Sequence, residues 1–71
     1  MRRIRFPGLL AESRLVSGID GATAVKLAWE RERYLHDGGF PGKAEDIKQI
    51  LEQDFVISES PQEVSYTLKS S

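Results

Sequence analysis

Few side chains in this sequence have the potential for catalytic or metal chemistry, and His36 is the only histidine. It lies beside Asp37 and near Glu32, so one hypothesis is a histidine–carboxylate pair that acts as a general base or a metal ligand. The other is a polar residue in the last turn of a helix, where positive charge suits the helix dipole. Because adjacent residues on a helix point in different directions, we favour the second interpretation.

The other residue types that carry out chemistry lack the required spacing. There is no cysteine, and neither Ser13 nor Ser17 lies in a glycine-flanked nucleophile elbow. The glycines do not form a phosphate-binding loop, since Lys43 after Gly42 is not followed by serine or threonine. The acidic residues do not have the spacing of a calcium loop. We therefore predict a protein that is not an enzyme and has no catalytic site, metal site or cofactor.

Two aromatic residues are candidates for a protein interface. Trp29 falls at the edge of the apolar face of a predicted helix, with Arg33 one turn further on, and an exposed tryptophan beside arginine is typical of an interface anchor. Phe40 lies in a proline-glycine turn and is the second candidate. Three further aromatic residues are expected in the core: Phe6, Phe55 and Tyr66.

The basic residues near the N-terminus form a set without compensating acids: Arg2, Arg3 and Arg5. This set is either a solvated tail, which we favour, or an arm that contacts phosphate or an acidic partner. A second set, Arg31 and Arg33, alternates with Glu30 and Glu32. We expect these residues to form exposed pairs on a helix surface, worth a few tenths of a kcal/mol.

Hydrophobic periodicity predicts the elements that position these side chains. A short strand at residues 4–6 precedes a segment at 9–16 with one or two helical turns. A long helix follows at 22–35, with Asp20 as its N-cap and with Ala24 and Ala28 at the centre of its apolar face. A second helix is expected at 43–53. Alternating apolar residues from Phe55 to Leu68 then indicate a β-hairpin.

The predicted fold class is α+β: two to three helices packed on one face of a small antiparallel sheet made of the N-terminal strand and the C-terminal hairpin. The 71 residues have room for one domain, with frayed ends at 1–3 and 70–71. A core of this size is marginal without disulfides, so a homodimer is one way to stabilise it.

The order of helices followed by a hairpin also resembles a winged helix-turn-helix. In that interpretation residues 43–53 form the recognition helix, and Lys43 and Lys48 join the three N-terminal arginines as nucleic-acid contacts. The same helix also carries Glu45, Asp46 and Glu52, which match a polyanion poorly. A formal net charge of −1 also weighs against nucleic-acid binding, because domains that bind a phosphate backbone usually have a basic excess.

Composition favours a globular protein of the cytoplasm. Apolar residues make up 39% and charged residues 30% of the chain, and no apolar run approaches the roughly 20 residues that span a bilayer. The leading hypothesis is a small non-catalytic protein that acts by protein–protein contact, as a homo-oligomer or as a regulator that docks on a larger protein. The alternative is a winged-helix transcriptional regulator.

Overall fold

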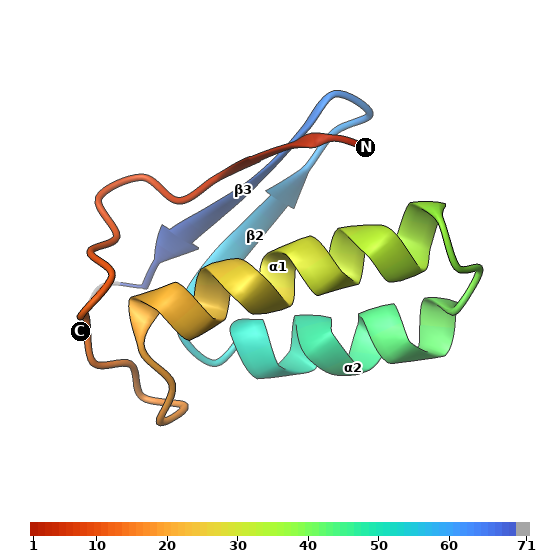
Figure 1. Ribbon diagram of the computed structural model, residues 1–71. Coiled ribbons are helices and arrows are strands. Elements are labelled where there is room, and N and C mark those ends of the chain that lie inside the picture. The colour runs from red at the N-terminus through yellow and green to blue at the C-terminus, as the bar shows by residue number, and fades with distance from the viewer. Residues whose placement is uncertain (70–71) are drawn as a thin grey trace.

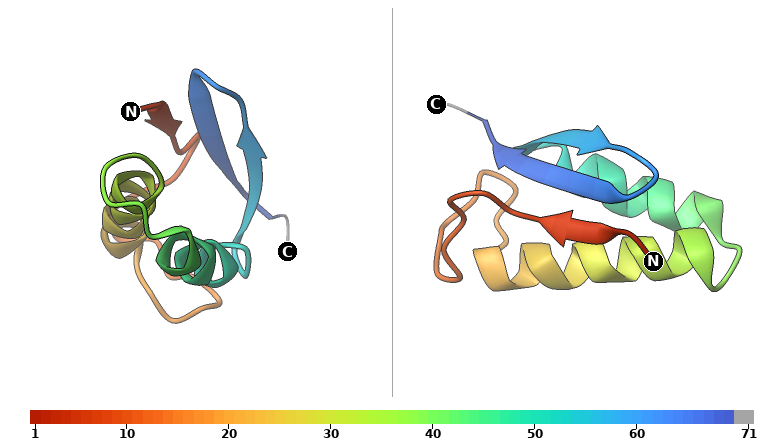
Figure 2. Two further views of the ribbon diagram at one scale, coloured as in Figure 1. Left: turned by 90° about the vertical axis from the view of Figure 1, so that its right-hand side faces the viewer. Right: turned by 90° about the horizontal axis from the view of Figure 1, so that it is seen from above.

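The computed structural model describes residues 1–69, which form two helices and a three-stranded sheet (Figure 1). In chain order the elements are β1 (Arg3–Arg5), α1 (Gly21–His36), α2 (Pro41–Leu51), β2 (Phe55–Glu59) and β3 (Glu63–Leu68). The two helices lie side by side, run in opposite directions and cover the same face of the sheet (Figures 1 and 2). The predicted α+β class, with helices on one face of a sheet made from the N-terminal strand and the hairpin, is confirmed.

The sheet is mixed, so the prediction of an all-antiparallel sheet is wrong. β2 and β3 form the expected antiparallel hairpin, with Phe55 opposite Leu68 and Glu59 opposite Val64. β1 pairs with β3 in parallel, which gives the strand order β1-β3-β2. Each connection along the chain reverses direction, so β1 runs parallel to β3 and antiparallel to β2 (Figure 1). Because β1 lies next to β3, its pairing is parallel.

Residues 9–16 are not helical, which corrects the prediction of a short helix there. They form turns, with one isolated bridge between Arg14 and Asp20. The backbone groups of this segment and of the next residue find distant partners: the carbonyl of Ala11 accepts from the N–H of Ala22, and the carboxylate of Asp54 accepts from Val16 and Ser17. These tertiary hydrogen bonds replace the local ones of a helical turn.

α1 begins at Gly21, one residue before the predicted start, and Asp20 is its N-cap as predicted. The carboxylate of Asp20 accepts a hydrogen bond from the backbone N–H of Thr23 at 2.8 Å, which is the geometry of an N-cap. Ala24 and Ala28 are both fully buried, so α1 and its neighbours approach closely at this face. α2 begins at Pro41, two residues before the predicted start, because proline suits the first turn of a helix.

The core lies between the helix pair and the inner face of the sheet. The ring of Phe6 stacks on Tyr66 at a centroid distance of 4.7 Å and meets Phe55 edge-on at 5.4 Å. Phe55 and Tyr66 are buried in the core as predicted, and Phe6 is partly buried and packs against it. The remaining buried apolar residues come from both helices and β3: Ala24, Ala28, Ala44, Ile47, Leu51 and Val64.

Two glycines in the first turns of the helices should respond in opposite ways to substitution by alanine. A Cβ on Gly21 would lie 2.1 Å from the backbone oxygen of Leu10, whereas a Cβ on Gly42 would have no neighbour within 4 Å. We expect Gly21→Ala to destabilise the protein by at least about 1 kcal/mol through overpacking. Gly42→Ala should stabilise it by about 0.5–1 kcal/mol, because alanine restricts the unfolded chain. Urea unfolding of both variants tests this, and equal effects would contradict the packing at Gly21.

Candidate functional site

Charged side chains close the end of the core that lies beneath the β2–β3 turn. Ile4 packs on the core, so Arg2, two residues earlier, lies on the same face of β1. Glu59 is opposite the buried Val64 and therefore also lies on the helix-facing side. α1 supplies the remaining members. We call Arg2, Arg31, Glu32, His36 and Glu59 the charged cluster.

Glu32 is the most buried member of the charged cluster, with 0% of its side chain exposed. Arg2 donates to both of its oxygens, from Nη2 to Oε1 at 2.6 Å and from Nε to Oε2 at 3.2 Å. The Nε2 atom of His36 lies 3.0 Å from the same Oε2. A histidine–carboxylate pair therefore exists here, and its carboxylate belongs to Glu32. Because Arg2 also occupies that carboxylate, the pair is part of an ion-pair network.

Arg31 connects the charged cluster to the core. Its side chain is 4% exposed and donates to the hydroxyl of Tyr66 at 2.9 Å and to Oε1 of Glu59 at 2.6 Å. Arg2 donates to the same Oε1 at 3.0 Å, and Nζ of Lys48 lies 3.6 Å from Oε2. The carboxylate of Glu59 therefore contacts three cationic side chains: one precedes β1, one belongs to α1 and one belongs to α2. These contacts link three separate parts of the fold.

The charges of the cluster shift one another's pKa values. Burial alone would raise the pKa of Glu32, but the hydrogen bonds and charge of Arg2 outweigh it and hold the pKa below its usual value. The pKa of Glu59 is likewise lowered, because Arg31 and Arg2 outweigh the effect of burial. The hydrogen bond to Glu32 raises the pKa of Arg2. Arg2, Glu32 and Glu59 are therefore ionised at neutral pH.

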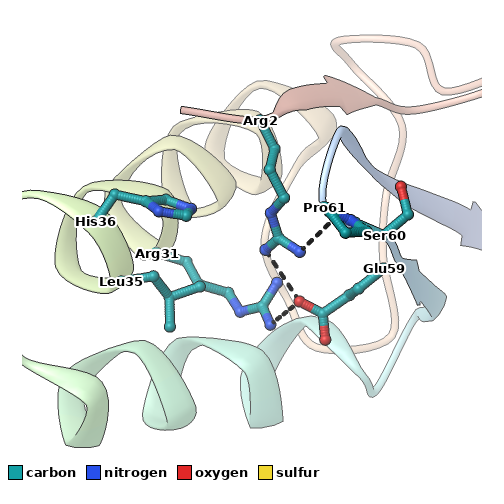
Figure 3. Close-up of a pocket in the computed structure, with 7 residues that line it drawn as sticks. All are labelled: Arg2, Arg31, Leu35, His36, Glu59, Ser60 and Pro61. Carbon is teal, nitrogen blue, oxygen red and sulfur yellow. Dashed lines mark hydrogen bonds and ion pairs between the residues drawn. The ribbon is translucent and has the colours of Figure 1, made fainter.

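An open pocket of about 710 Å³ lies beside the charged cluster (Figure 3). Its lining combines polar and apolar side chains from three places in the chain: Arg2, Arg31, Leu35, His36, Glu59, Ser60 and Pro61. The side chains of Arg2 and Arg31 converge on Glu59, and His36 lies on the α1 side of the same space (Figure 3). The Nε atom of Arg31 is buried and has no hydrogen-bond acceptor among the described residues.

Trp29 and Arg33 are both exposed on α1, one helical turn apart. Trp29 has 47% of its surface exposed and is not among the residues that pack on the core. Phe40 is 52% exposed, and its ring meets Tyr34 edge-on at 6.1 Å. Trp29 and Tyr34 are five residues apart and so about 140° apart around the helix. The structure therefore does not gather the three predicted interface residues into one surface.

The predicted nucleic-acid residues are also dispersed. Arg2 and Lys48 both contact Glu59, and Arg5 lies 3.7 Å from a carboxylate oxygen of Glu63. The prediction that the N-terminal arginines lack compensating acids is therefore wrong for Arg2 and Arg5. Arg3 is exposed in β1, so residues 2 and 3, expected to fray, take part in the fold. The predicted frayed residues 70–71 lie outside the described residues.

Lys43, the remaining basic candidate, is placed over two aromatic rings. Its Nζ lies 5.3 Å from the ring centroid of Tyr34 and 5.1 Å from that of Phe40, within the range of a cation–π contact. Lys43 therefore packs in the first turn of α2 against Tyr34 of α1 and Phe40, and it does not contact Glu59, where Arg2 and Lys48 meet.

The burial of Arg31 and Glu32 is the main feature that sequence reasoning missed. Both were expected in exposed pairs on a helix surface, and both are buried. The spacing did contain a signal for Arg31, which follows Ala24 by seven residues and Ala28 by three. These intervals place it on the buried face of α1. The distant partners in β2 and before β1 could not be identified from spacing within the helix.

Comparisons with protein-family models, with curated proteins and with solved structures gave no match to this chain. Within residues 1–69, no group of three histidine, cysteine or acidic side chains is arranged to hold a metal ion. The helices of this part of the chain also lack the length and apolar character needed to cross a membrane.

Removing Glu32 should be far more destabilising than removing its exposed neighbour Glu30. Glu32→Ala leaves the partly buried Arg2 without its main partner, and breaking a buried ion pair costs about 3–5 kcal/mol. Glu30→Ala is the matched control on the same helix and should change the free energy of unfolding by less than about 0.5 kcal/mol. Chemical denaturation measures both, and equal losses would contradict a structural role for the charged cluster.

The lowered pKa values of Glu32 and Glu59 predict acid sensitivity. A carboxyl group with a folded pKa below its ordinary value of 4.5 stabilises the folded state above that value, and this stabilisation is lost as pH falls through the folded pKa. We expect the free energy of unfolding to decrease from about pH 5 downward. Glu59→Gln should show a smaller decrease, because one titrating group is gone. Urea unfolding at a series of pH values tests this, and a flat profile down to about pH 3 would contradict it.

Proposed function

We propose that this protein is a small non-catalytic, cytoplasmic binding module that acts by contact with an acidic segment of a protein partner. The observation that carries this proposal is the exposure of Trp29 on α1 between the basic residues Lys26 and Arg33. Four exposed residues at intervals of three, four and three lie along this surface, which we call the tryptophan stripe: Lys26, Trp29, Arg33 and His36. A helical stripe of this spacing presents one continuous face to a partner.

The chemistry of the tryptophan stripe favours a partner with negative charge and apolar side chains. Trp29 supplies a large apolar surface, and tryptophan and arginine are enriched among the residues that dominate binding energy at interfaces. Lys26 and Arg33 flank it with positive charge. A second copy of the chain docked on the same stripe would bring these cations against each other, which opposes self-association at this surface.

Two features weigh against the alternative of a winged-helix DNA-binding protein. The helix pair of a helix-turn-helix crosses at about 90–120°, whereas α1 and α2 lie side by side and antiparallel (Figures 1 and 2). The basic residues that this alternative needs are also engaged elsewhere, with Arg2 and Lys48 bound to Glu59. DNA binding therefore remains the second candidate and serves as an outcome of the test.

Trp29 is the only tryptophan in the chain, so its fluorescence reports directly on the tryptophan stripe. The probe is an acetylated and C-terminally amidated peptide of glutamate and leucine, and a lysine–leucine peptide of equal length is the control. We expect a saturable blue shift of the Trp29 emission with the acidic peptide alone, weakened by salt. Arg33→Glu should reduce the affinity about tenfold or more, and the matched variant Arg14→Glu, exposed outside α1, should leave it unchanged.

Three outcomes would contradict the proposal. The acidic peptide produces no change in Trp29 emission at millimolar concentration, or both peptides produce the same change, or Arg14→Glu weakens binding as much as Arg33→Glu. A random-sequence DNA duplex that shifts the emission at lower concentration than the acidic peptide would place the nucleic-acid alternative first. Circular dichroism of both variants confirms that they retain the fold.

A further inference from the structure

We infer that the free edge of β2 binds a second copy of this chain: the two β2 strands pair antiparallel about a two-fold axis at Ile57. This pairing joins two three-stranded sheets into one continuous sheet. The surface lies outside the tryptophan stripe, so the inference goes beyond the proposed function. The evidence lies in the backbone groups of β2, in the side chains beside them and in the charges of α2.

The outer edge of β2 presents unpaired backbone groups. The strand order β1-β3-β2 leaves one side of β2 open, and within residues 1–69 no other element lies beyond it (Figure 2). The N–H of Lys69 donates to the carbonyl of Asp54 at 2.9 Å, just before β2. The N–H of Ser60, just after β2, donates to the carbonyl of Glu63 at 2.7 Å. Because bonded pairs alternate in an antiparallel ladder, the even-numbered residues of β2 face β3. The N–H and C=O groups of the odd-numbered residues therefore face the free edge: Phe55, Ile57 and Glu59.

Antiparallel pairing about Ile57 uses all of these free groups. Ile57 then lies opposite Ile57 of the second copy, and Phe55 lies opposite Glu59, so each outward residue belongs to a hydrogen-bonded pair. Each pair contributes two hydrogen bonds, about six in total. A register shifted by two residues loses one of the three pairs. The two-fold axis is perpendicular to the sheet, so the helices of both copies lie on the same face.

The side chains of β2 are compatible with a second copy at this edge. Ile57 is partly buried against the core, so its two copies meet on the helix-facing side and lose further apolar surface to the interface. Val56 is 58% exposed on the outer face and lies beside Ser58 of the second copy. Proteins block free edges with proline, bulges or charge, but β2 contains no proline and its register with β3 is unbroken. Its one charged residue, Glu59, is already compensated by arginines.

The charges of α2 complement each other across the two-fold axis. The Nζ atom of Lys48 lies 3.6 Å from a carboxylate oxygen of Glu59, which places it at that end of β2. Glu52 is exposed one helical turn later on the same side of α2, and only two residues separate it from Phe55. The axis at Ile57 exchanges the two ends of β2, so Lys48 of one copy faces Glu52 of the other. This complementarity favours a second copy over an unrelated strand.

Backbone amide NMR spectra of the full chain at increasing concentration test the pairing. We expect the amide protons of the three outward residues of β2 to shift downfield, because they gain hydrogen bonds only in the dimer. The amide of Ile4 is the matched control and should not shift. It faces the free edge of β1, since the N–H of the adjacent Arg3 donates to Gln62 on the other side. Sedimentation equilibrium of the same samples should show the mean mass rising from 8.0 kDa towards twice that value.

Charged variants on the outer face of β2 test the register. Val56→Lys/Ser58→Lys and Val56→Glu/Ser58→Glu each set like charges against each other across the axis, and each should weaken the dimer about tenfold or more. Val56→Glu/Ser58→Lys is the matched control, because it sets opposite charges against each other and should remain a dimer. An equimolar mixture of the two like-charge variants should form dimers again. Circular dichroism confirms that all three variants retain the fold.

Four outcomes would overturn the inference. The chain stays monomeric at millimolar concentration, or the amide of Ile4 shifts while those of β2 do not, or the like-charge variants dimerise as strongly as the control, or their mixture stays monomeric. Each of these results leaves the proposed function intact, because a monomer can still bind the glutamate–leucine peptide at the tryptophan stripe. Conversely, a β2 dimer whose Trp29 emission does not respond to that peptide contradicts the proposed function alone.

Discussion

The carboxylate of Glu59 is the point at which the layers of this small protein are joined. It accepts from Arg2 ahead of β1 and from Arg31 of α1, and Lys48 of α2 lies beside it. β1 is only three residues long, so its ladder to β3 supplies few hydrogen bonds. The contacts of Arg2 with Glu59 and Glu32 therefore hold this strand in place at the end of the sheet. Removing Glu59 would leave the buried Arg31 without its carboxylate partner.

A second carboxylate, at the other end of β2, also holds a distant segment of the chain in place through hydrogen bonds. Asp54 directly precedes the strand and accepts from the backbone of Val16 and Ser17, which fixes the long connection between β1 and α1. These hydrogen bonds outweigh the effect of burial and lower the pKa of Asp54. Partly buried residues of that connection, such as Leu15 and Ile19, can then pack on the core without a helix of their own. The hydrogen-bonded carboxylates of Asp54 and Glu59, one at each end of β2, thus lie at the two limits of the apolar core.

Local pattern predicted the elements well and their assembly less well. The periodicity of α1, its cap at Asp20 and the alternation in β2 and β3 are properties of neighbouring residues, and the structure agrees with them. The parallel pairing of β1 and the irregular path of residues 9–16 depend on partners far along the chain. The same limit applies to the site: helical spacing placed Arg31 on the buried face, but only the fold brings Glu59, 28 residues later, within 2.6 Å of it.

The arrangement separates the residues that hold the fold from those that are exposed on the surface around them. Arg31 and Glu32 are buried and Arg2 is partly buried, so a change in any of them affects the free energy of unfolding. Trp29, Leu35, His36 and Pro61 surround them on the surface. In the charged cluster the two arginines, Arg2 and Arg31, face the two carboxylates of Glu32 and Glu59, so the charges of this network compensate one another at low local dielectric. The exposed apolar residues around it, Trp29, Leu35 and Pro61, take no part in these ion pairs.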